Sequence, residues 1–333
     1  MLIFANMSLP KISIITPSYN QGQFIEQTID SVLSQGYPNV EYIIIDGGST
    51  DNSVEIIKKY AKHISYWISE KDNGQSDAIN KGLKMASGDV INWLNSDDYY
   101  EPNALLTIGQ YFEDDSIHVL AGKSKIWKND SYFISPGTDI YPTVEKTIGY
   151  ARIDQPETFF RKSAIDKMGL LNTDLHYIMD REWWIRYLLL FGQDGIIKTE
   201  QILVNFRIHE GSKTNNKPAD FFQETLNVYY TVALHYQLGE ADFFKSQLAA
   251  SEMELFNFPE LSDLSVVRQA IHYFWYFQGC MQYASNNYQL ASLFFRPISK
   301  QYLMPQDVAE MEKIKLRMKI LPVFIKKIWN RND

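Results

Sequence analysis

The stretch that constrains the fold most strongly reads Asp89-Val90-Ile91-Asn92-Trp93-Leu94-Asn95-Ser96-Asp97-Asp98-Tyr99-Tyr100. Its apolar first half follows Gly88, which predicts a buried central strand over Asp89–Leu94. Four oxygen-bearing side chains come next, and two of them are adjacent carboxylates. In open α/β sheets ligands lie beyond the carboxyl ends of the strands, and Mg²⁺ prefers oxygen ligands. The stretch therefore predicts a cation site, although Asn-Ser-Asp-Asp is equally suited to a solvated turn.

Strands and helices alternate around this segment. The apolar runs Ile12–Thr16, Val40–Ile45 and Ile64–Ser69 predict strands, and helical spacing occupies Phe24–Ser34, the region from about Asn52, and Gln75–Ala86. This alternation predicts a Rossmann-like, mostly parallel, doubly wound α/β sheet.

The pattern changes after a further predicted helix over Pro102–Phe112. We expect a β pair at Val119–Trp127 and Tyr132–Ile134, a polar loop over Gly137–Asp154, and a segment from Gln155 to Arg161 that leads into a short helix. A helix from Asp180 to Phe191 is followed by two short strands, Gly195–Lys198 and Leu203–Ile208. From Pro218 onward the periodicity is helical. We therefore expect one domain over residues 1–217 and an all-helical region over 218–333.

Composition excludes several classes of protein. The 333 residues are 45% hydrophobic and 14% aromatic, which is enough for a sizeable core. The net charge of −8 argues against a nucleic-acid binder that works through bulk charge. Cys280 stands alone, which excludes an internal disulfide and suits a reducing compartment. With no apolar run long enough to span a bilayer and no secretory signal, we expect a cytoplasmic protein.

A second polar segment, Asp46-Gly47-Gly48-Ser49-Thr50-Asp51, follows the strand Val40–Ile45. A strand, a glycine turn and a helix N-terminus together suit a nucleotide phosphate, but helix capping by Ser49, Thr50 or Asp51 explains the same residues. The segment matches neither the dinucleotide fingerprint nor a Walker-type loop.

Four separated stretches, taken in order, resemble the family-2 glycosyltransferases and their GT-A fold over roughly residues 10 to 215. They are Thr16-Pro17-Ser18-Tyr19-Asn20, Asp46-Gly47-Gly48-Ser49-Thr50-Asp51, Asn95-Ser96-Asp97-Asp98, and Asp180-Arg181-Glu182-Trp183-Trp184-Ile185-Arg186. The resemblance implies inverting transfer of a hexose from a nucleoside-diphosphate sugar, UDP-linked, to an acceptor hydroxyl, with Mn²⁺ or Mg²⁺. It also implies a role in bacterial polysaccharide or cell-surface glycan synthesis, with a glycan or lipid-linked acceptor.

The resemblance assigns nucleotide contacts to residues after the first two strands. Thr16, Pro17 and Tyr19 are expected at the nucleoside, and Asp46 occupies the first acidic position of the family. Many members carry a second acid directly after it, which contacts the base, but this chain has Gly47. The group that reads the base therefore stays open among Lys71, Asp72 and Asp77, and Asp77 is included among the expected nucleotide-sugar contacts.

The metal motif departs from the family pattern at its first position, where Asn95 replaces the usual acid. Asn95 is expected to hydrogen-bond the ribose, with Ser96 beside it, so Asp97 becomes the expected metal ligand. Asp98 is expected as an outer contact or a donor-sugar contact. The segment Arg207–Ser212 looks like the one that closes the site in many members. Its His209 is expected to bind the metal or phosphate, and an ordinary loop histidine is the alternative.

Asp180 matches the catalytic base of the family, and Glu182 is its helical neighbour. A positioned carboxylate that takes the proton of the acceptor hydroxyl contributes about 10²–10⁴-fold to the rate. The alternative for Asp180 is a helix N-terminal acid favoured by the helix dipole. Trp93, Trp183 and Trp184 could stack on sugar rings, but core packing is the commoner fate of tryptophan.

Two other classes remain open. One is a non-catalytic nucleotide-sugar or glycan-binding module, which predicts a missing base or metal carboxylate. The other is a nucleotidyltransferase, which normally has a basic glycine-rich loop after its first strand. Asp180 and Asp97 are both present, and Ser18–Gly22 contains no Lys or Arg.

The C-terminal region carries two further expectations. The aromatic residues between Ala219 and Leu303 are expected to pack on one another and shape the acceptor side, or to form a dimer interface. From Lys313 to Arg331 the chain alternates basic and apolar residues and contains no acid. Such a segment suits a helix at the inner face of a membrane; capping of the helical region is the alternative.

Overall fold

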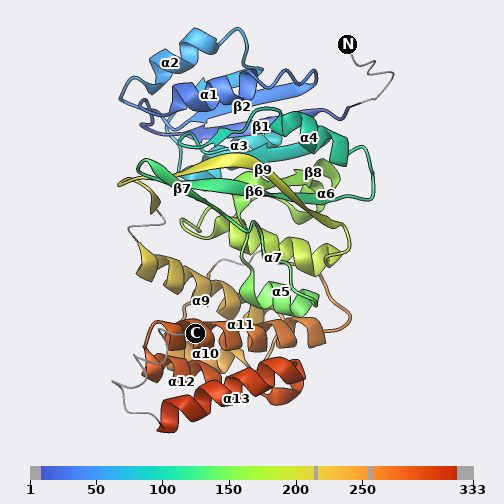
Figure 1. The fold of residues 1–333 in the computed structure, drawn as a ribbon, viewed down its shortest axis with the longest axis vertical. Helices are drawn as coiled ribbons and strands as arrows, with labels where there is room; N and C mark the ends of the chain where they lie inside the picture. The colour runs from blue at the N-terminus through green and yellow to red at the C-terminus, as the bar shows by residue number, and fades with distance from the viewer. Residues whose placement is uncertain (1–8, 214–216, 254–257, 321–333) are drawn as a thin grey trace. The chain divides into compact units, whose positions relative to one another are not determined.

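The computed structural model describes residues 9–213, 217–253 and 258–320 (Figure 1). Two compact units make up the chain. The first contains Met1–Asp139 and Ile153–Glu224, and the second contains Ile140–Arg152 and Thr225–Asp333. The predicted division at residues 217 and 218 stays a prediction, and each unit is described on its own.

The described strands of the first unit form one nine-stranded sheet of order β3-β2-β1-β4-β8-β6-β9-β5, with β7 paired to β6. β1 to β4 form one parallel group, and β6 and β9 form a second parallel pair, which confirms the predicted Rossmann-like, mostly parallel α/β class. The strands are β1 (Ile12–Ser18), β2 (Val40–Asp46), β3 (Tyr66–Ser69), β4 (Val90–Trp93), β5 (Tyr99–Tyr100), β6 (Val119–Lys128), β7 (Ser131–Ile134), β8 (Thr158–Arg161) and β9 (Ile196–Ile208).

Helices cover both faces of this sheet, which explains why its strands read as apolar runs rather than alternating ones. Ile12 and Ile14 of β1 share a core cluster with residues of α1 (Ile25–Leu33), α2 (Ser53–Tyr60) and α4 (Ala104–Tyr111). On the other face Ile15 meets α3 (Gln75–Met85): a Cβ at Gly82 would lie 2.3 Å from an Ile15 side-chain carbon. Gly82 therefore lets the helix approach the sheet closely.

The strands beyond β4 in the sheet order, β8 and β9 in particular, differ from the sequence predictions. Thr158–Arg161, predicted to lead directly into a helix, forms β8 between β4 and β6, before α6 (Lys162–Met168). A short 3₁₀ turn at Gln155–Glu157 precedes it. The two strands predicted at 195–198 and 203–208 are one strand, β9, with a register shift opposite β6. Lys198 pairs with Ala121 and Ile202 with Lys123, so the polar residues between Lys198 and Ile202 form a bulge within the strand.

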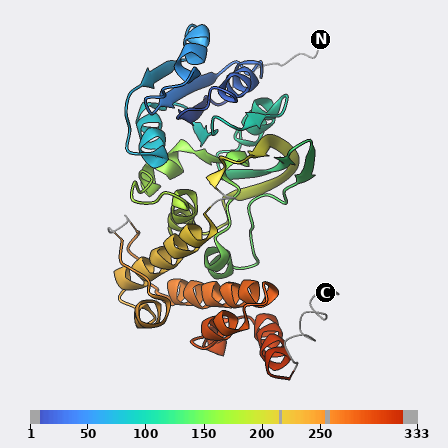
Figure 2. The ribbon, with the colours of Figure 1, turned by 90° about the vertical axis from the view of Figure 1, so that its left-hand side faces the viewer.

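The second unit is helical in its described residues. Its helices are α5 (Val144–Tyr150), α9 (Pro218–His235, from Thr225 on), α10 (Ala241–Leu248), α11 (Ser265–Ala284), α12 (Tyr288–Phe295) and α13 (Pro305–Ile320), with a 3₁₀ turn at Lys300–Tyr302. The green α5 lies beside the orange α11 (Figures 1 and 2). The prediction of a loop over Gly137–Asp154 was wrong here.

Close packing explains why α5 forms. A Cβ at Gly149 would lie 2.3 Å from the Tyr273 Cβ, so glycine lets α5 approach α11. A buried ion pair of 2.6 Å joins Lys146 to Asp307 of α13. The expected aromatic packing also occurs within this unit, since Tyr229 and Phe274 stack with their ring centroids 3.9 Å apart.

The predicted basic C-terminal helix is described only in part. α13 ends at Ile320, and residues 321–333 lie outside the described residues. Within the described part of the chain, no helix is both long and apolar enough to cross a membrane.

Candidate active site

A pocket of about 680 Å³ lies at the carboxyl ends of β1, β2 and β4. Six of the predicted site residues line it, and they come from two strand ends and one helix. These are Pro17 at the end of β1 and Tyr19 just after it, Asn95, Ser96 and Asp97 after β4, and Asp180 from α7 (Met179–Phe191). The other lining residues include Gly47, Lys71, Asp72 and Lys213.

The remaining predicted site residues do not line this pocket. Thr16 is buried, with its hydroxyl 3.1 Å from the Tyr42 hydroxyl. The Asp77 carboxylate accepts a 3.1 Å hydrogen bond from the Asn73 backbone N–H and lies 3.7 Å from Lys81 Nζ. Asp98 is buried beneath the pocket floor, and His209 lines a neighbouring groove.

The carboxylate of Asp46 is buried and surrounded by donors. Oδ2 accepts from the Ser69 hydroxyl at 2.6 Å and from the backbone N–H groups of Gly48 and Ser49 at 3.1 and 2.9 Å. Oδ1 accepts from the Ser49 hydroxyl at 2.5 Å. Because four donors occupy a carboxylate's acceptor sites, Asp46 shapes the turn, and a direct contact with a base would have to displace one of them.

Asp72 occupies the space that a side chain at position 47 would take. A Cβ built on Gly47 would lie 2.5 Å from Asp72 Oδ2. Asp72 Oδ1 accepts a 2.9 Å hydrogen bond from the Gly74 backbone N–H, which fixes the carboxylate at the pocket wall. Of the three residues left open for reading the base, Lys71 and Asp72 line the pocket and Asp77 does not.

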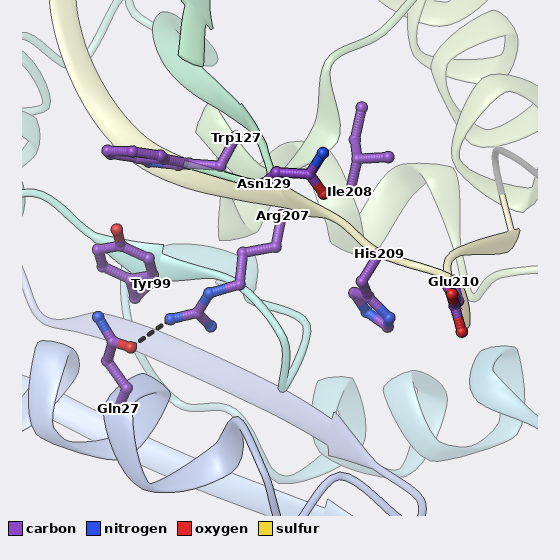
Figure 3. A pocket seen from close by; sticks show the side chains of 8 residues that line it. All are labelled: Gln27, Tyr99, Trp127, Asn129, Arg207, Ile208, His209 and Glu210. Atoms are coloured by element: carbon purple, nitrogen blue, oxygen red, sulfur yellow. Dashed lines mark hydrogen bonds between the residues drawn. The ribbon is translucent and has the colours of Figure 1, made fainter. Parts of the chain in front are cut away.

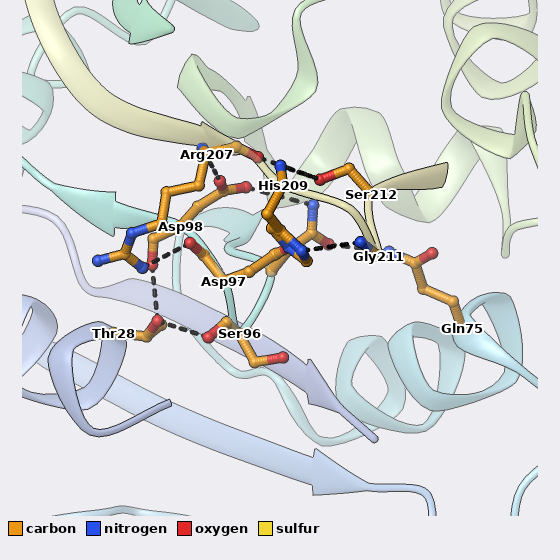
Figure 4. A network of polar contacts seen from close by, with 10 residues as sticks. Thr28, Gln75, Ser96, Asp97, Asp98, Arg207, His209, Gly211 and Ser212 are labelled. Atoms are coloured by element: carbon orange, nitrogen blue, oxygen red, sulfur yellow. Dashed lines mark hydrogen bonds and ion pairs between the residues drawn. The ribbon is translucent and has the colours of Figure 1, made fainter. Parts of the chain in front are cut away.

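Asp97 and His209 meet at the edge of the pocket, with 3.0 Å between Oδ2 and Nε2 (Figure 4). Arg207 holds this segment by two hydrogen bonds: its backbone N–H donates to Asp98 Oδ1 at 3.0 Å, and its Nη1 donates to the Asp97 carbonyl at 2.6 Å. Burial, and then the neighbouring Asp97 carboxylate, raise the pKa of Asp98 well above its usual range. Thr28 adds hydrogen bonds to the carbonyls of Ser96 and Asp98 at 2.9 and 2.7 Å.

These residues fit a divalent cation held partly by a bound ligand. Mg²⁺ is commonly bound through one or two carboxylates together with substrate phosphates and waters. Among the described residues, no group of three or more His, Cys, Asp or Glu side chains is arranged to hold an ion. The Asp97–His209 pair supplies two ligands, so a diphosphate would have to supply others.

Asp180 lies in the first turn of α7 and is partly buried in the pocket wall. Its Oδ1 accepts a 2.7 Å hydrogen bond from the Arg181 backbone N–H. Loss of water around the carboxyl raises the pKa of Asp180 to about 6. Its neighbour Glu182 is fully buried and paired with Arg186 at 2.7 Å. Asp180, rather than Glu182, is therefore open to a ligand.

Glu224 supports the segment before Asp180, and sequence reasoning missed it. Its carboxylate accepts hydrogen bonds from the backbone N–H groups of His176, Tyr177 and Ile178 at 3.0, 2.9 and 3.2 Å. These N–H groups lead into α7, so Glu224 fixes the entry of the helix that carries Asp180. An acid in the helical region 46 residues after Ile178 gives no sequence signal for this contact.

Lys213 is a second residue that the predicted site omitted. Its Nζ donates to Gln75 Oε1 at 2.9 Å and to the His176 carbonyl at 3.1 Å. Burial lowers the pKa of the Lys213 ammonium. Lys213 directly follows Arg207–Ser212, the segment expected to close the site, and this position was the one sequence feature that could have indicated its role.

Trp93, Trp183 and Trp184 pack mainly in the core. Trp183 and Trp184 are fully buried, and the Trp183 ring lies 5.5 Å from Trp93 and 5.0 Å from Phe160. Trp93 borders the pocket but is only 3% exposed. Sugar stacking on Trp183 or Trp184 is therefore excluded in this arrangement.

A second groove of about 440 Å³ is lined in part by His209, the residue that contacts Asp97 (Figure 3). It is lined by Gln27, Tyr99, Trp127, Asn129, Arg207, Ile208, His209 and Glu210. Of these residues, His209 alone was predicted as a site residue, although Arg207, Ile208 and Glu210 belong to the segment that was expected to close the site.

Comparison of the sequence with protein families gives one match, to the model described as glycosyl transferase family 2, over residues 13–187. An uncharacterized glycosyltransferase of Rickettsia typhi is 29% identical over 224 residues, which cover 63% of this chain and 68% of that protein. A putative teichuronic acid biosynthesis glycosyltransferase of Bacillus subtilis, TuaG, is 41% identical over 101 residues, or 29% of this chain and 39% of TuaG.

Solved structures share the fold at low sequence identity. Residues 1–349 of S. aureus TarS in complex with UDP-GlcNAc match with a TM-score of 0.55 and 17% identity, covering 88% of this chain and 91% of that one. This chain spans 54% of a longer TarS structure. The mannosyltransferase PcManGT from Pyrobaculum calidifontis, in complex with GDP-Man and Mn²⁺, matches with a TM-score of 0.52 and 15% identity, covering 93% and 86%. These similarities establish the GT-A-like fold.

Proposed function

Because the chain belongs to glycosyl transferase family 2, we propose that it is an inverting hexosyltransferase that moves a sugar from a UDP-linked donor to an acceptor hydroxyl. The observation that carries this proposal is that Asp97 and Asp180 line one pocket at the carboxyl ends of the parallel strands. A role in bacterial polysaccharide or cell-surface glycan synthesis is supported by the similarity to TuaG.

Asp180 acts as the base in this proposal. The acceptor oxygen forms a bond to the anomeric carbon while the bond from that carbon to the diphosphate oxygen breaks. The electron pair stays with the diphosphate, and the hydroxyl proton passes to Asp180. Attack opposite the leaving group inverts the anomeric centre. With a pKa of about 6, Asp180 is mostly ionised at pH 7 and still basic enough to accept the proton.

The leaving diphosphate needs positive charge around it. Asp97 and His209 are the residues that would hold a Mn²⁺ or Mg²⁺ ion, with Asn95 and Ser96 beside them at the pocket. Such an ion supplies Lewis-acid stabilisation of the phosphate oxygens. Lys213, whose ammonium is held by Gln75 and His176, would add a protein cation to the same pocket. Arg207 would position the Asp97–Asp98 segment through its two hydrogen bonds to it.

The base of the nucleotide would lie at the β2–β3 side of the pocket, with Pro17 and Tyr19 at the nucleoside. This orientation follows from the sheet order, since the phosphate ligands stand after β4 and Asp72 stands after β3. Asp72 is the proposed acceptor for the N–H of a uracil ring, in the space beside Gly47. Asp46 would support the turn beneath it.

The acceptor is proposed to be a glycan or a lipid-linked acceptor, bound at the inner face of the cell membrane. Residues 1–217 would form the transferase domain and 218–333 the helical region. Support for membrane proximity comes from Lys313, Lys315, Arg317 and Lys319 of α13, beside Leu316, whose side chain is 56% exposed. Ion pairs of Lys313 with Glu310 and of Lys315 with Glu312 reduce the net charge of this helix.

The test is to incubate the full chain with UDP-, GDP- and CMP-linked sugars and Mn²⁺, and to measure slow donor hydrolysis. We expect a UDP donor to be consumed and the α-linked sugar to be released first as its β anomer. Nucleotide binding without turnover of any donor would favour a non-catalytic binding module instead.

A further inference from the structure

The groove beside the donor pocket combines aromatic rings with neutral polar groups. Tyr99 and Trp127 supply the rings, and Gln27 and Asn129 supply amides (Figure 3). We propose that this groove binds a sugar residue of the acceptor glycan other than the one that reacts. The inference rests on the proposed function and adds a second carbohydrate subsite to it.

The orientation of Trp127 is fixed by its surroundings. Its Nε1 donates a 2.7 Å hydrogen bond to Asn205 Oδ1, and the buried Asn205 amide donates in turn to Glu101 Oε1 at 2.6 Å. On the hairpin, the Trp127 ring lies 4.7 Å from the ring of Tyr132, its direct cross-strand partner. Because the indole N–H is already bonded, Trp127 offers a ligand its apolar ring surface, which suits the apolar face of a sugar.

The amide of Asn129, at the hairpin turn, lines the same groove as that ring. Asn129 follows β6 directly and has a φ of +55°, a left-handed conformation that asparagine tolerates. An amide supplies both donors and an acceptor, which match the hydroxyl groups of a sugar. The exposed carboxylate of Glu210 also lines the groove and can accept from hydroxyls.

The charges argue against a phosphate in this groove. Among the described residues that line it, Arg207 is the one with a permanent positive charge. Its Nη1 already donates to the Asp97 carbonyl, its Nη2 donates to Gln27, and its guanidinium lies 4.5 Å from the Tyr99 ring centroid. Glu210 would repel an anion as well. A neutral sugar is therefore the better match.

His209 connects the groove to the transfer site. His209 lines the groove, and its Nε2 contacts Asp97. Asp97 in turn lines the donor pocket. A glycan that reaches from the donor pocket past His209 would thus place a second sugar on Trp127. Such a contact would favour a longer acceptor over a single sugar.

The test is a binding assay on an array of mono- to tetrasaccharides of glucose, galactose, mannose, rhamnose and N-acetylglucosamine, with UDP and Mn²⁺ present. The full chain is compared with Trp127→Ala, Asn129→Gly and Phe133→Ala. Asn129→Gly removes the amide while keeping a residue suited to positive φ. Phe133→Ala is the matched control, because Phe133 is an exposed ring on the opposite face of the same hairpin.

We expect the unmodified chain to bind at least one oligosaccharide more tightly than its monosaccharide. Trp127→Ala should weaken that binding by about tenfold, as for an interface anchor, and Asn129→Gly by a smaller factor, with Phe133→Ala unchanged. Equal binding by all variants, or no binding by a chain that hydrolyses its donor, would overturn the subsite. A chain that also fails to hydrolyse any donor would instead contradict the proposed function. Melting temperatures identify any variant that fails to fold.

Discussion

The Oδ2 atom of Asp97 lies 3.0 Å from the Nε2 atom of His209, although the two residues are 112 positions apart in the chain. Asp97 follows β4 and His209 follows β9, so the contact joins the ends of two strands that β8 and β6 separate in the sheet. A carboxylate and an imidazole at this separation can share a cation.

Removing the charge of Asp97 should therefore disable catalysis. Asp97→Asn is expected to lower donor turnover by about 10²–10³-fold, because the bound cation contributes several kcal/mol of charge stabilisation in the transition state. It should also weaken Mn²⁺-dependent UDP binding. His209→Ala should reduce Mn²⁺ affinity by about 10–100-fold. Asp115→Asn, at a fully exposed carboxylate, is the control. Calorimetric titration of each variant with UDP, in the presence and absence of Mn²⁺, measures the change in affinity. Full activity in excess chelator would exclude a metal role.

The base-reading role of Asp72 can be tested by moving its carboxylate. Asp72→Ala should lower UDP affinity by about 10–100-fold, because a hydrogen bond to a charged group is lost. Gly47→Asp alone should also weaken binding, since its Cβ would lie 2.5 Å from Asp72 Oδ2. The double variant should recover much of the affinity. Gly48 rather than Gly47 has the positive φ, 82°, so position 47 accepts a side chain.

The control for this exchange is Asp77→Asn, which changes an acid outside the pocket. UDP and CDP are titrated in parallel, because neutral cytosine has no proton on ring N3 and so lacks the N3–H donor that uracil offers to a carboxylate. If Asp72→Ala binds UDP as well as the unmodified chain does, the base is read elsewhere.

Glu224 should control the rate without touching the substrate. Glu224→Ala leaves three N–H groups before α7 without their carboxylate, and a small displacement of a catalytic group can cost about 10²-fold. We expect a lower kcat, a smaller change in KM for the donor, and a partial recovery in Glu224→Gln. Glu200→Gln, at a largely exposed carboxylate, is the control. A lower melting temperature with an unchanged kcat would reduce Glu224 to a structural residue.

Membrane contact is the expectation for the chain from Lys313 to Arg331. Each basic residue near an anionic leaflet contributes about 1 kcal/mol, so anionic vesicles should sediment the full chain at low salt. Binding should disappear at high salt and on deletion of residues 313–333. Absence of co-sedimentation at low salt would end this proposal and favour capping of the helical region.

The parallel half of the fold could be predicted because both of its faces are buried. Each strand there reads as an apolar run, and the helices between them have clear periodicity. β8 was missed because Thr158–Arg161 is short, follows Gln-Pro-Glu, and obtains its partners β4 and β6 from distant parts of the chain. α5 was missed for a similar reason, because it packs against α11, more than a hundred residues later in the chain.

The site shows the same limit. The end of a predicted strand directed Asp97 to the site, and the family resemblance directed Asp180 to it; both line the pocket. The sequence could not show that the Ser69 hydroxyl, at the end of a different strand, would donate a hydrogen bond to the Asp46 carboxylate. Nor could it show that Asp72 would fill the space beside Gly47, since that depends on how the turns after β2 and β3 meet.

The central claim is that Asp180 removes the acceptor proton during sugar transfer. The most direct measurement is donor turnover from pH 5 to pH 8 for the full chain and for Asp180→Asn. Because burial raises the pKa of Asp180 to about 6, the base is ionised above that pH, so the rate should fall as pH drops through about 6 and level off above it. Asp180→Asn should still bind UDP but turn over about 10²–10⁴-fold more slowly, without that step. An Asp180→Asn variant that keeps the normal rate while a folded Glu182→Gln variant is inactive would contradict the assignment.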